Sequence, residues 1–162
     1  MVKIMKGDLL ELADEGKFDV IAHGCNCLGI MGAGIAAQIA NKYPVVAKKD
    51  KEHSNSIFRK EDMLGTNLTV FYQKPVIVNC YTQLLPGKQF DYAAFEVCMK
   101  KLKVAFRPEY NIGIPQIGCG IAGGNWQIVL RILEEIFTDR DITVVIYEPK
   151  IKNRIYPNAG KF

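Results

Sequence analysis

The sequence lacks any long hydrophobic run. No apolar stretch approaches the roughly 20 residues that a membrane-spanning helix requires. The first eight residues contain neither an apolar core nor the cleavage site of a signal peptide. We therefore expect a cytoplasmic protein that does not interact with membranes.

Histidine is scarce, with two residues, and the five cysteines form no pair of Cys-x-x-Cys motifs. A structural zinc site normally takes four Cys or His ligands from such pairs. Disulfides are also rare in a reducing compartment. We therefore predict no metal site, no bound cofactor, and thiols that are reduced and buried.

A strong excess of one charge is also lacking. The chain has 21 Lys and Arg against 17 Asp and Glu, a net charge of +4, which by itself is too little to indicate nucleic-acid binding. With 162 residues, 49% of them apolar, the chain fits one globular domain. We expect this domain to span residues 1–148 and to be monomeric. Residues 149–162 are then a basic tail, which leaves binding of nucleic acid by the tail as an alternative.

Strand and helix patterns alternate along the chain. Compact apolar or β-branched runs predict strands, and apolar residues at helical spacing predict helices. Strands are expected at residues 2–6, 18–23, 68–72, 76–81, 111–115 and 142–147. Helices are expected after Asp8 and at residues 35–43, 45–53, 92–106 and 126–137, the fourth with an apolar stripe of Phe95, Val97, Cys98, Leu102 and Phe106. Since such alternation requires crossover connections, we predict an α/β fold, a three-layer α/β/α sandwich around a mixed, largely parallel six-stranded sheet.

Two glycine-rich segments, residues 24–34 and 118–124, follow predicted strands and lead into predicted helices. Glycine lets backbone N–H groups approach an anion closely, and the start of a helix adds partial positive charge. Ligands of open α/β sheets bind at the carboxyl ends of the strands. Two such loops at one sheet edge therefore predict a site for a linear ligand that carries phosphate.

The common phosphate-binding motifs are absent. The sequence contains no Gly-x-x-x-x-Gly-Lys-Ser/Thr loop and no Gly-x-Ser-x-Gly elbow. Gly29, Gly32 and Gly34 do not have the spacing of a dinucleotide-binding fingerprint. A phosphocysteine loop would need arginine at the sixth position after Cys119, where this chain has Asn125.

Five short segments carry a family resemblance. They are Gly7-Asp8-Leu9, His23-Gly24-Cys25-Asn26-Cys27, Met31-Gly32-Ala33-Gly34-Ile35-Ala36, Pro115-Gln116-Ile117-Gly118-Cys119-Gly120-Ile121-Ala122-Gly123-Gly124 and Trp126. Together they resemble a macro domain, and within that family the branch of the fungal ADP-ribose 1″-phosphate phosphatases. The resemblance covers residues 1–148, and it implies that the ligand is ADP-ribose or its 1″-phosphate.

The resemblance also implies roles for individual residues. Asp8 would accept a hydrogen bond from the adenine amino group beside the backbone of Gly7 and Leu9, and Tyr147 would pack on the adenine. The phosphates and the distal ribose would be held by the two glycine-rich loops and the amides near them. These residues are Gly24, Asn26, Met31, Gly32, Ala33, Gly34, Ile35, Gln83, Gln116, Ile117, Gly118, Cys119, Gly120, Ile121 and Ala122.

His23 and Asn26 are the catalytic candidates, the first to orient water or protonate the leaving oxygen and the second to hold water or a ribose hydroxyl. The alternatives are a histidine satisfied by backbone hydrogen bonds at the base of the loop, and a turn asparagine that tolerates a left-handed conformation. We expect Asp8 to cap a helix as well, Trp126 to pack under the loop, and His53 to be exposed.

The expected activity is removal of phosphate from ADP-ribose 1″-phosphate to give ADP-ribose. A reader that binds ADP-ribose without catalysis is an alternative, and so is a hydrolase that removes ADP-ribose from macromolecules. The sister branch, the terminal ADP-ribose protein glycohydrolases, would have lysine and an acid near Gln83 and Ala122. Neither residue of this chain can do that chemistry, which disfavours the hydrolase.

Overall fold

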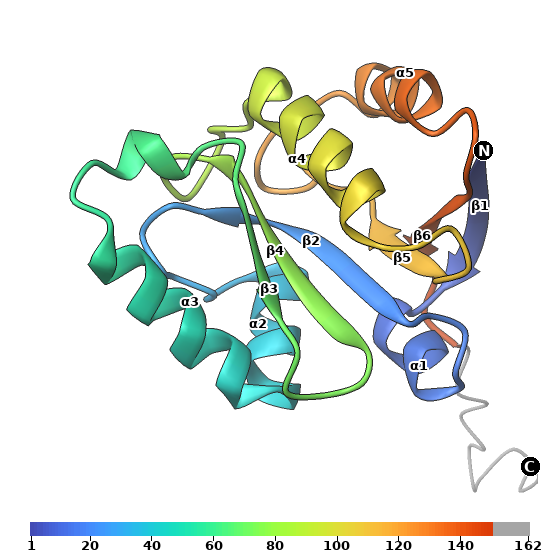
Figure 1. Ribbon diagram of the computed structural model, residues 1–162, viewed down its shortest axis with the longest axis horizontal. Helices are drawn as coiled ribbons and strands as arrows, with labels where there is room; N and C mark the ends of the chain where they lie inside the picture. Colours follow the sequence, from blue (N-terminus) through green and yellow to red (C-terminus); the bar gives the residue numbers. More distant parts are fainter. Residues whose placement is uncertain (151–162) are drawn as a thin grey trace, which may run out of the picture.

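The computed structural model describes residues 1–150 (Figure 1). Its strands are β1 (Val2–Gly7), β2 (Val20–Asn26), β3 (Asn67–Val70), β4 (Val76–Gln83), β5 (Ile112–Pro115) and β6 (Ile142–Tyr147). Its helices are α1 (Leu9–Asp14), α2 (Gly34–Lys42), α3 (Pro44–Ser56), α4 (Tyr92–Ala105) and α5 (Trp126–Ile136), and a short 3-10 helix, η1 (Lys60–Met63), precedes β3.

All six strands join one sheet in the order β1-β6-β5-β2-β4-β3. Every neighbouring pair is parallel except β3 and β4, which form an antiparallel hairpin. Parallel neighbours need crossovers, and the helices between the strands supply them. The predicted mixed, largely parallel sheet is therefore confirmed.

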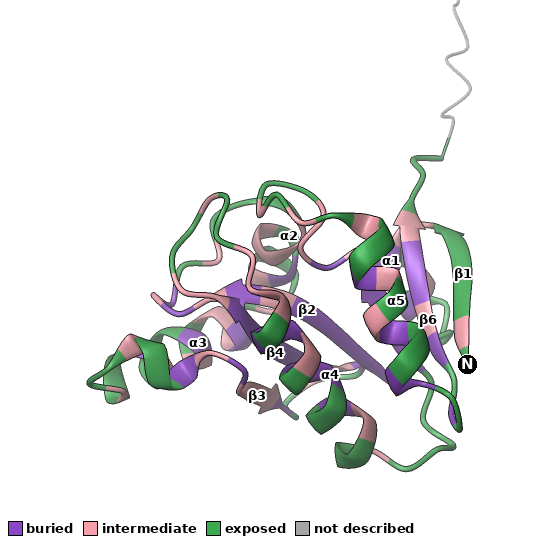
Figure 2. Cartoon of the chain, turned by 90° about the horizontal axis from the view of Figure 1, so that it is seen from above, coloured by how far each residue is buried: buried purple, intermediate pink, exposed green. Residues whose placement is uncertain are grey.

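Helices cover both faces of the sheet. Alternate residues of each strand point to opposite sides, so Val20 and Ala22 belong to a core with α4 and α5, while Ile21 belongs to a core with α1, α2 and α3. The two groups of helices lie on opposite sides of the sheet in Figure 1, and Figure 2 shows β2 largely buried between them. The three-layer sandwich is confirmed.

Two local predictions are wrong. Val97 does not belong to the apolar stripe of α4 but is 43% exposed, because a period of 3.6 residues places Phe95, Cys98 and Met99 on one face and Val97 on another. The second strand does not end at His23 but continues to Asn26. The continuation follows from pairing with β4, whose Asn79 and Cys80 align with His23 and Gly24.

None of the helices in residues 1–150 combines the length and the hydrophobicity needed to cross a bilayer. The prediction of a basic tail at residues 149–162 falls almost entirely outside the described residues, and it stays a prediction.

The sheet brings five chain segments to one edge. Because β1, β6, β5, β2 and β4 run in the same direction, their carboxyl ends lie together. Those ends are Gly7, Tyr147, Pro115, Asn26 and Gln83. The loops that follow them form the candidate site.

Candidate functional site

Two adjoining cavities form a groove along this edge of the sheet. The larger, of about 540 Å³, lies at the ends of β2, β4 and β5, and the smaller, of about 240 Å³, at the ends of β1 and β6. They share Ile35 and Pro115, so one extended ligand can occupy both. The larger is lined by Gly24, Cys25, Asn26, Ile30, Gly32, Ala33, Gly34, Ile35, Ala36, Thr82, Gln83, Pro86, Gly87, Pro115, Gln116, Ile117, Gly118, Gly120, Ile121 and Ala122. The smaller is lined by Gly7, Asp8, Leu9, Ile35, Gln38, Pro115, Val145 and Tyr147.

The first glycine-rich loop joins β2 to α2 and forms one wall of the larger cavity. Asn26 shapes it: its Oδ1 accepts the N–H of Leu28 at 3.0 Å, and its Nδ2 donates to the carbonyl of Ile30 at 2.8 Å. Helix α2 then begins at Gly34, and no side chain caps it. A helix start whose first N–H groups have no side-chain partner is suited to bind an anion.

The second glycine-rich loop follows β5 and forms the opposite wall. Gly118 is in the left-handed region, with φ +78°, and its carbonyl accepts the N–H of Gly124 at 2.6 Å. The ring of Phe90 supports this loop so closely that a Cβ at Gly118 would lie 2.2 Å from its Cε2. Trp126 packs against the core next to the loop, as predicted.

The start of α5 does not contribute to the groove. Its N-terminus is capped by Asn125, whose side chain accepts the N–H of Gln127 at 2.9 Å. No residue of α5 lines either cavity. Of the two helix starts predicted to face the ligand, the structure places only that of α2 at the groove.

A third wall, residues 84–90, was not predicted. Pro86 and Gly87 line the larger cavity. Gln83 holds this segment, since its Nε2 donates to the carbonyls of Leu85 at 2.8 Å and Gly87 at 3.2 Å. The Phe90 N–H donates to the carbonyl of Ala122 at 3.3 Å and joins the segment to the second loop. The available signal was the Pro-Gly turn after a strand whose carboxyl end reaches the same sheet edge.

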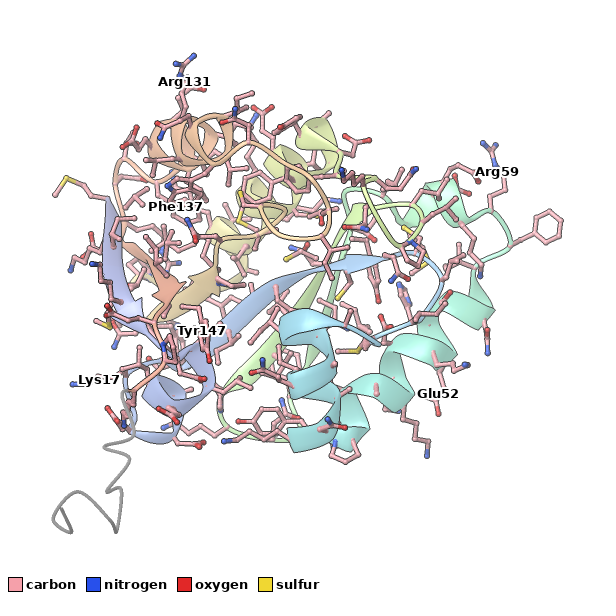
Figure 3. All side chains as sticks on the ribbon, turned by 180° about the vertical axis from the view of Figure 1, so that it is seen from behind. Lys17, Glu52, Arg59, Arg131, Phe137 and Tyr147 are labelled. Atoms are coloured by element: carbon pink, nitrogen blue, oxygen red, sulfur yellow. The ribbon has the colours of Figure 1, made fainter. Side chains whose placement is uncertain are left out.

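The smaller cavity contains the predicted adenine residues. Asp8 caps α1, because its Oδ1 accepts the N–H groups of Leu10 at 3.0 Å and Glu11 at 3.1 Å; the predicted capping role is confirmed. Leu9 turns its side chain into the core, so it can contact a ligand only through its backbone. Tyr147, at the end of β6 (Figure 3), is 67% exposed and pairs in register with Gly7.

His23 does not reach the groove. Its side chain is completely buried, and its Nε2 donates to Oδ1 of Asn79 at 2.6 Å. Asn79 in turn donates to Asp50 of α3 at 3.2 Å, and so does the hydroxyl of Tyr81 at 2.7 Å. Burial lowers the pKa of His23 to about 4, although the bond to Asn79 opposes the shift. A neutral histidine out of reach of the ligand does not agree with the predicted direct role in catalysis.

Three other predictions need correction. Met31 packs against the core of α1–α3 and does not line a cavity. The backbone N–H of Cys119, expected to bind phosphate, instead donates to the carbonyl of Gln116 at 3.2 Å, and its side chain packs against the opposite core. Burial raises the pKa of the Cys119 thiol, so it is a poor nucleophile. His53 is half-buried and stacks on Tyr81, with ring centroids 5.7 Å apart.

The groove has almost no ionisable side chains. Apart from the buried thiol of Cys25, whose pKa burial raises, Asp8 and the Tyr147 phenol are the titratable side chains among the described lining residues, and none of them is a cation. Any anion in the larger cavity is therefore held mainly by backbone N–H groups and side-chain amides.

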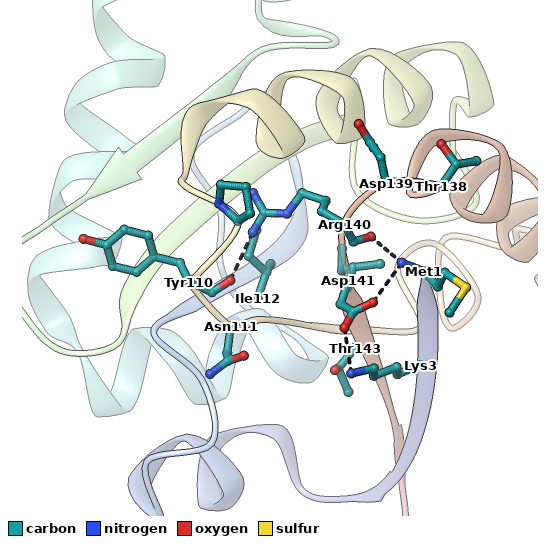
Figure 4. Close-up of a pocket in the computed structure, with 12 residues that line it drawn as sticks. Met1, Lys3, Tyr110, Asn111, Ile112, Thr138, Asp139, Arg140, Asp141 and Thr143 are labelled. Atoms are coloured by element: carbon teal, nitrogen blue, oxygen red, sulfur yellow. Dashed lines mark hydrogen bonds and ion pairs between the residues drawn. The ribbon is translucent and has the colours of Figure 1, made fainter.

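A further cavity, of about 460 Å³, lies at the opposite edge of the sheet (Figure 4). Its charged groups already pair with one another: the Met1 ammonium and Lys3 both contact Asp141, at 3.0 and 2.7 Å. The Arg140 guanidinium donates to four backbone carbonyls, one of them that of Tyr110 at 3.0 Å. These contacts hold the N-terminus and β1 against Asp141, just before β6, and the charged side chains that form them have little unpaired charge left for a ligand.

Comparison with known proteins agrees with this geometry. The family model for the macro domain matches residues 22–133. A 17.5 kDa protein of Enterobacteria phage T4 is 36% identical over 159 residues, covering 92% of this chain and 98% of the phage protein. The ADP-ribose 1″-phosphate phosphatase of Candida albicans is 29% identical over 156 residues, covering 83% and 93% of the two chains.

The fold also matches a solved structure of Thermosipho africanus DarTG in complex with ADP-ribose. The TM-score is 0.70 at 18% identity, over 96% of this chain and 43% of that one. Since the family model covers more than half of the sequence and the phage protein matches along nearly its whole length, the chain belongs to the macro domain family.

Proposed function

We propose that the chain binds ADP-ribose in the groove and removes the phosphate from ADP-ribose 1″-phosphate. The observation that carries the proposal is the meeting of two glycine-rich loops across one groove. The uncapped start of α2 lies where the larger cavity joins the smaller one, since Ile35 lines both. The fungal phosphatases similar to this chain along most of its length support the same substrate, and the DarTG structure with ADP-ribose supports the ligand.

Adenine occupies the smaller cavity in this proposal. One oxygen of Asp8 caps α1, and the other is available to accept from the adenine amino group. Tyr147 packs on the ring. The diphosphate then lies between residues 32–35 and residues 118–122, where backbone N–H groups of both loops bind its oxygens.

The distal ribose lies in the larger cavity beside Asn26. The carboxamide oxygen of Asn26 has two lone pairs, and its carboxamide nitrogen has two N–H groups. The loop uses one lone pair and one N–H group. The remaining ones can hold a ribose hydroxyl or the attacking water. The oxygen of water attacks phosphorus and loses a proton, the bond from phosphorus to the ribose oxygen breaks, and the ribose oxygen takes up a proton to become the hydroxyl of ADP-ribose.

Positioning and electrostatic stabilisation by backbone N–H groups supply the rate acceleration. Since the groove lining in the described residues includes no strong general base, we expect a slow enzyme. The same feature favours the second candidate function, a reader that binds ADP-ribose without turnover.

Two assays on the same preparation test the proposal. We expect calorimetry to detect ADP-ribose binding, and a phosphate assay to detect release from ADP-ribose 1″-phosphate. Binding without release would support the reader, and the absence of both would refute the proposal.

Asp8 provides a matched pair of variants. Asp8→Ala removes both the helix cap and the adenine acceptor, whereas Asp8→Ser keeps a capping oxygen. We expect both to lose ADP-ribose affinity by about tenfold, the loss of one hydrogen bond to a charged group. Only Asp8→Ala should also lose about 1 kcal/mol of stability. Unchanged affinity in Asp8→Ser would place the adenine elsewhere.

A further inference from the structure

The proposed substrate carries more negative charge than the groove can balance with side chains. A phosphate monoester adds roughly −1.5 to −2 charge at neutral pH, in addition to the diphosphate. No lysine, arginine or histidine occurs among the described residues that line the two cavities. A cation close to the groove but outside its lining would add a charge-assisted contact to the backbone N–H groups that hold the phosphates.

Lys88 lies close to the groove on the third wall. Its side-chain stem lies along the second glycine-rich loop: a Cβ at Gly123 would be 3.4, 3.3 and 3.6 Å from its Cβ, Cγ and Cδ. Gly123 is in the left-handed region, with φ +79°, and having no side chain it leaves room for the stem. The ammonium lies two bonds beyond Cδ, and the residue as a whole is exposed.

The backbone on both sides of Lys88 is held in place. Gly87, before it, lines the larger cavity and accepts a hydrogen bond from Gln83 at 3.2 Å. Phe90, two residues after it, donates to Ala122 of the second loop at 3.3 Å. Lys88 is exposed and forms no ion pair with another residue in the range 1–150, so its charge is available to a ligand.

The sheet order shows which end of the ligand Lys88 would meet. The smaller cavity lies at the ends of β1 and β6, at one side of the sheet, while the third wall follows β4, three strands away from β6. A ligand with its adenine in the smaller cavity therefore directs its distal ribose toward β4. Gly87 of the third wall and Ile121 of the second loop both line the larger cavity, so a group at the 1″ position of this ligand would lie near the segment that carries Lys88.

We propose that Lys88 is a specificity-determining residue that binds the terminal phosphate of ADP-ribose 1″-phosphate and distinguishes this substrate from ADP-ribose. The inference rests on the proposed function, because it assumes that the groove holds this ligand in this direction. Lysine acts here as a mobile point charge, which can follow the phosphate as its charge redistributes during hydrolysis.

Three variants test the role of Lys88. Lys88→Gln removes the charge, Lys88→Arg retains it, and Lys48→Gln removes an equal charge from the exposed face of α3 as a control. For Lys88→Gln we expect KM for ADP-ribose 1″-phosphate to rise about tenfold, as for one partly exposed charge-assisted contact. The Kd for ADP-ribose should stay within about twofold of the wild-type value, because ADP-ribose lacks the terminal phosphate.

Two further readouts distinguish a contact from a structural effect. Lys88→Arg should restore most of the affinity, and added NaCl should raise the KM of the wild type more than that of Lys88→Gln, since salt screens the lost ion pair. Equal losses of affinity for ADP-ribose 1″-phosphate and for ADP-ribose would assign Lys88 to the diphosphate, and an unchanged KM would show that Lys88 does not bind the substrate. Either result overturns this inference and leaves the proposed function standing. A wild type that releases no phosphate would instead refute the proposed function, and with it the inference.

Discussion

Gly118 offers the sharpest test of how the second glycine-rich loop is built. In Gly118→Ala the new methyl carbon would lie 2.2 Å from Cε2, 2.3 Å from Cδ2 and 2.6 Å from Cζ of Phe90. Such separations are far inside van der Waals contact, so either the ring or the loop must move. The backbone φ of +78° adds a second cost, because alanine disfavours the left-handed region.

The expected magnitude follows from these two terms. The left-handed conformation costs alanine about 1–2 kcal/mol, and overpacking of a fitted site costs about 1–3 kcal/mol. If the loop keeps its position, the free energy of unfolding falls by about 2–5 kcal/mol, the sum of the two. If the loop shifts to relieve the contact, part of this cost appears as lost ADP-ribose affinity, about tenfold for each 1.4 kcal/mol.

Urea unfolding and calorimetry with ADP-ribose measure the two effects on the same protein. Gly16→Ala is the matched control: its φ of +82° carries the same backbone cost, but a Cβ there would meet nothing within 4 Å, and Gly16 lines neither cavity. The double variant Phe90→Ala, Gly118→Ala should lose less unfolding free energy than the sum of the losses in the two single variants, since substitutions in contact are not additive. Wild-type stability and affinity in Gly118→Ala would refute the account of the loop given above.

Two further predictions concern parts of the fold away from the loops. Acidification should destabilise the protein through His23: the pKa of about 4 in the folded state, against 6.5 ordinarily, means that only the unfolded chain gains a proton between these values. This proton accounts for a loss of about 2 kcal/mol of unfolding free energy from about pH 7 to pH 5; an equally steep pH dependence in His23→Gln would contradict this. Arg140→Met should lose about 3 kcal/mol in urea unfolding, because the guanidinium donates to the carbonyls of Lys103, Phe106, Arg107 and Tyr110 at 2.6–3.2 Å. Arg131→Met, on the exposed face of α5, should be neutral, and equal stability of the two variants would show that Arg140 is not needed there.

The case of His23 shows where local reasoning stops. The sequence placed this residue at the end of a strand beside a glycine-rich loop, which suggested contact with the ligand. Pairing with β4 extends the strand to Asn26. His23 then lies on the face of the sheet that α3 covers, beside Asn79 of β4, with which it forms a hydrogen bond. Whether a residue near a strand end faces the ligand or the core depends on this register, since each further residue reverses the side.

The third wall shows a second limit. Residues 84–90 look like an ordinary connection, and the Pro-Gly turn that follows β4 is the one signal in them that points to the site. Their place in the site comes from Phe90, which packs under Gly118, and from Lys88, which lies along Gly123. These partners are 28 and 35 residues apart in the sequence, so only the folded chain brings them together.

The sequence by itself determined the alternation of strands and helices, the layers they form, the glycine-rich loops and the family resemblance. These features follow from short-range periodicity, caps and glycine, whose physical causes lie within a few neighbouring residues. Only the tertiary structure decided that two cavities join through Ile35 and Pro115, that His23 is buried and neutral, and that the stem of Lys88 lies along Gly123 of the second glycine-rich loop. Those outcomes depend on strand register and on contacts between distant segments, because burial and proximity are properties of the assembled sheet and not of any one segment.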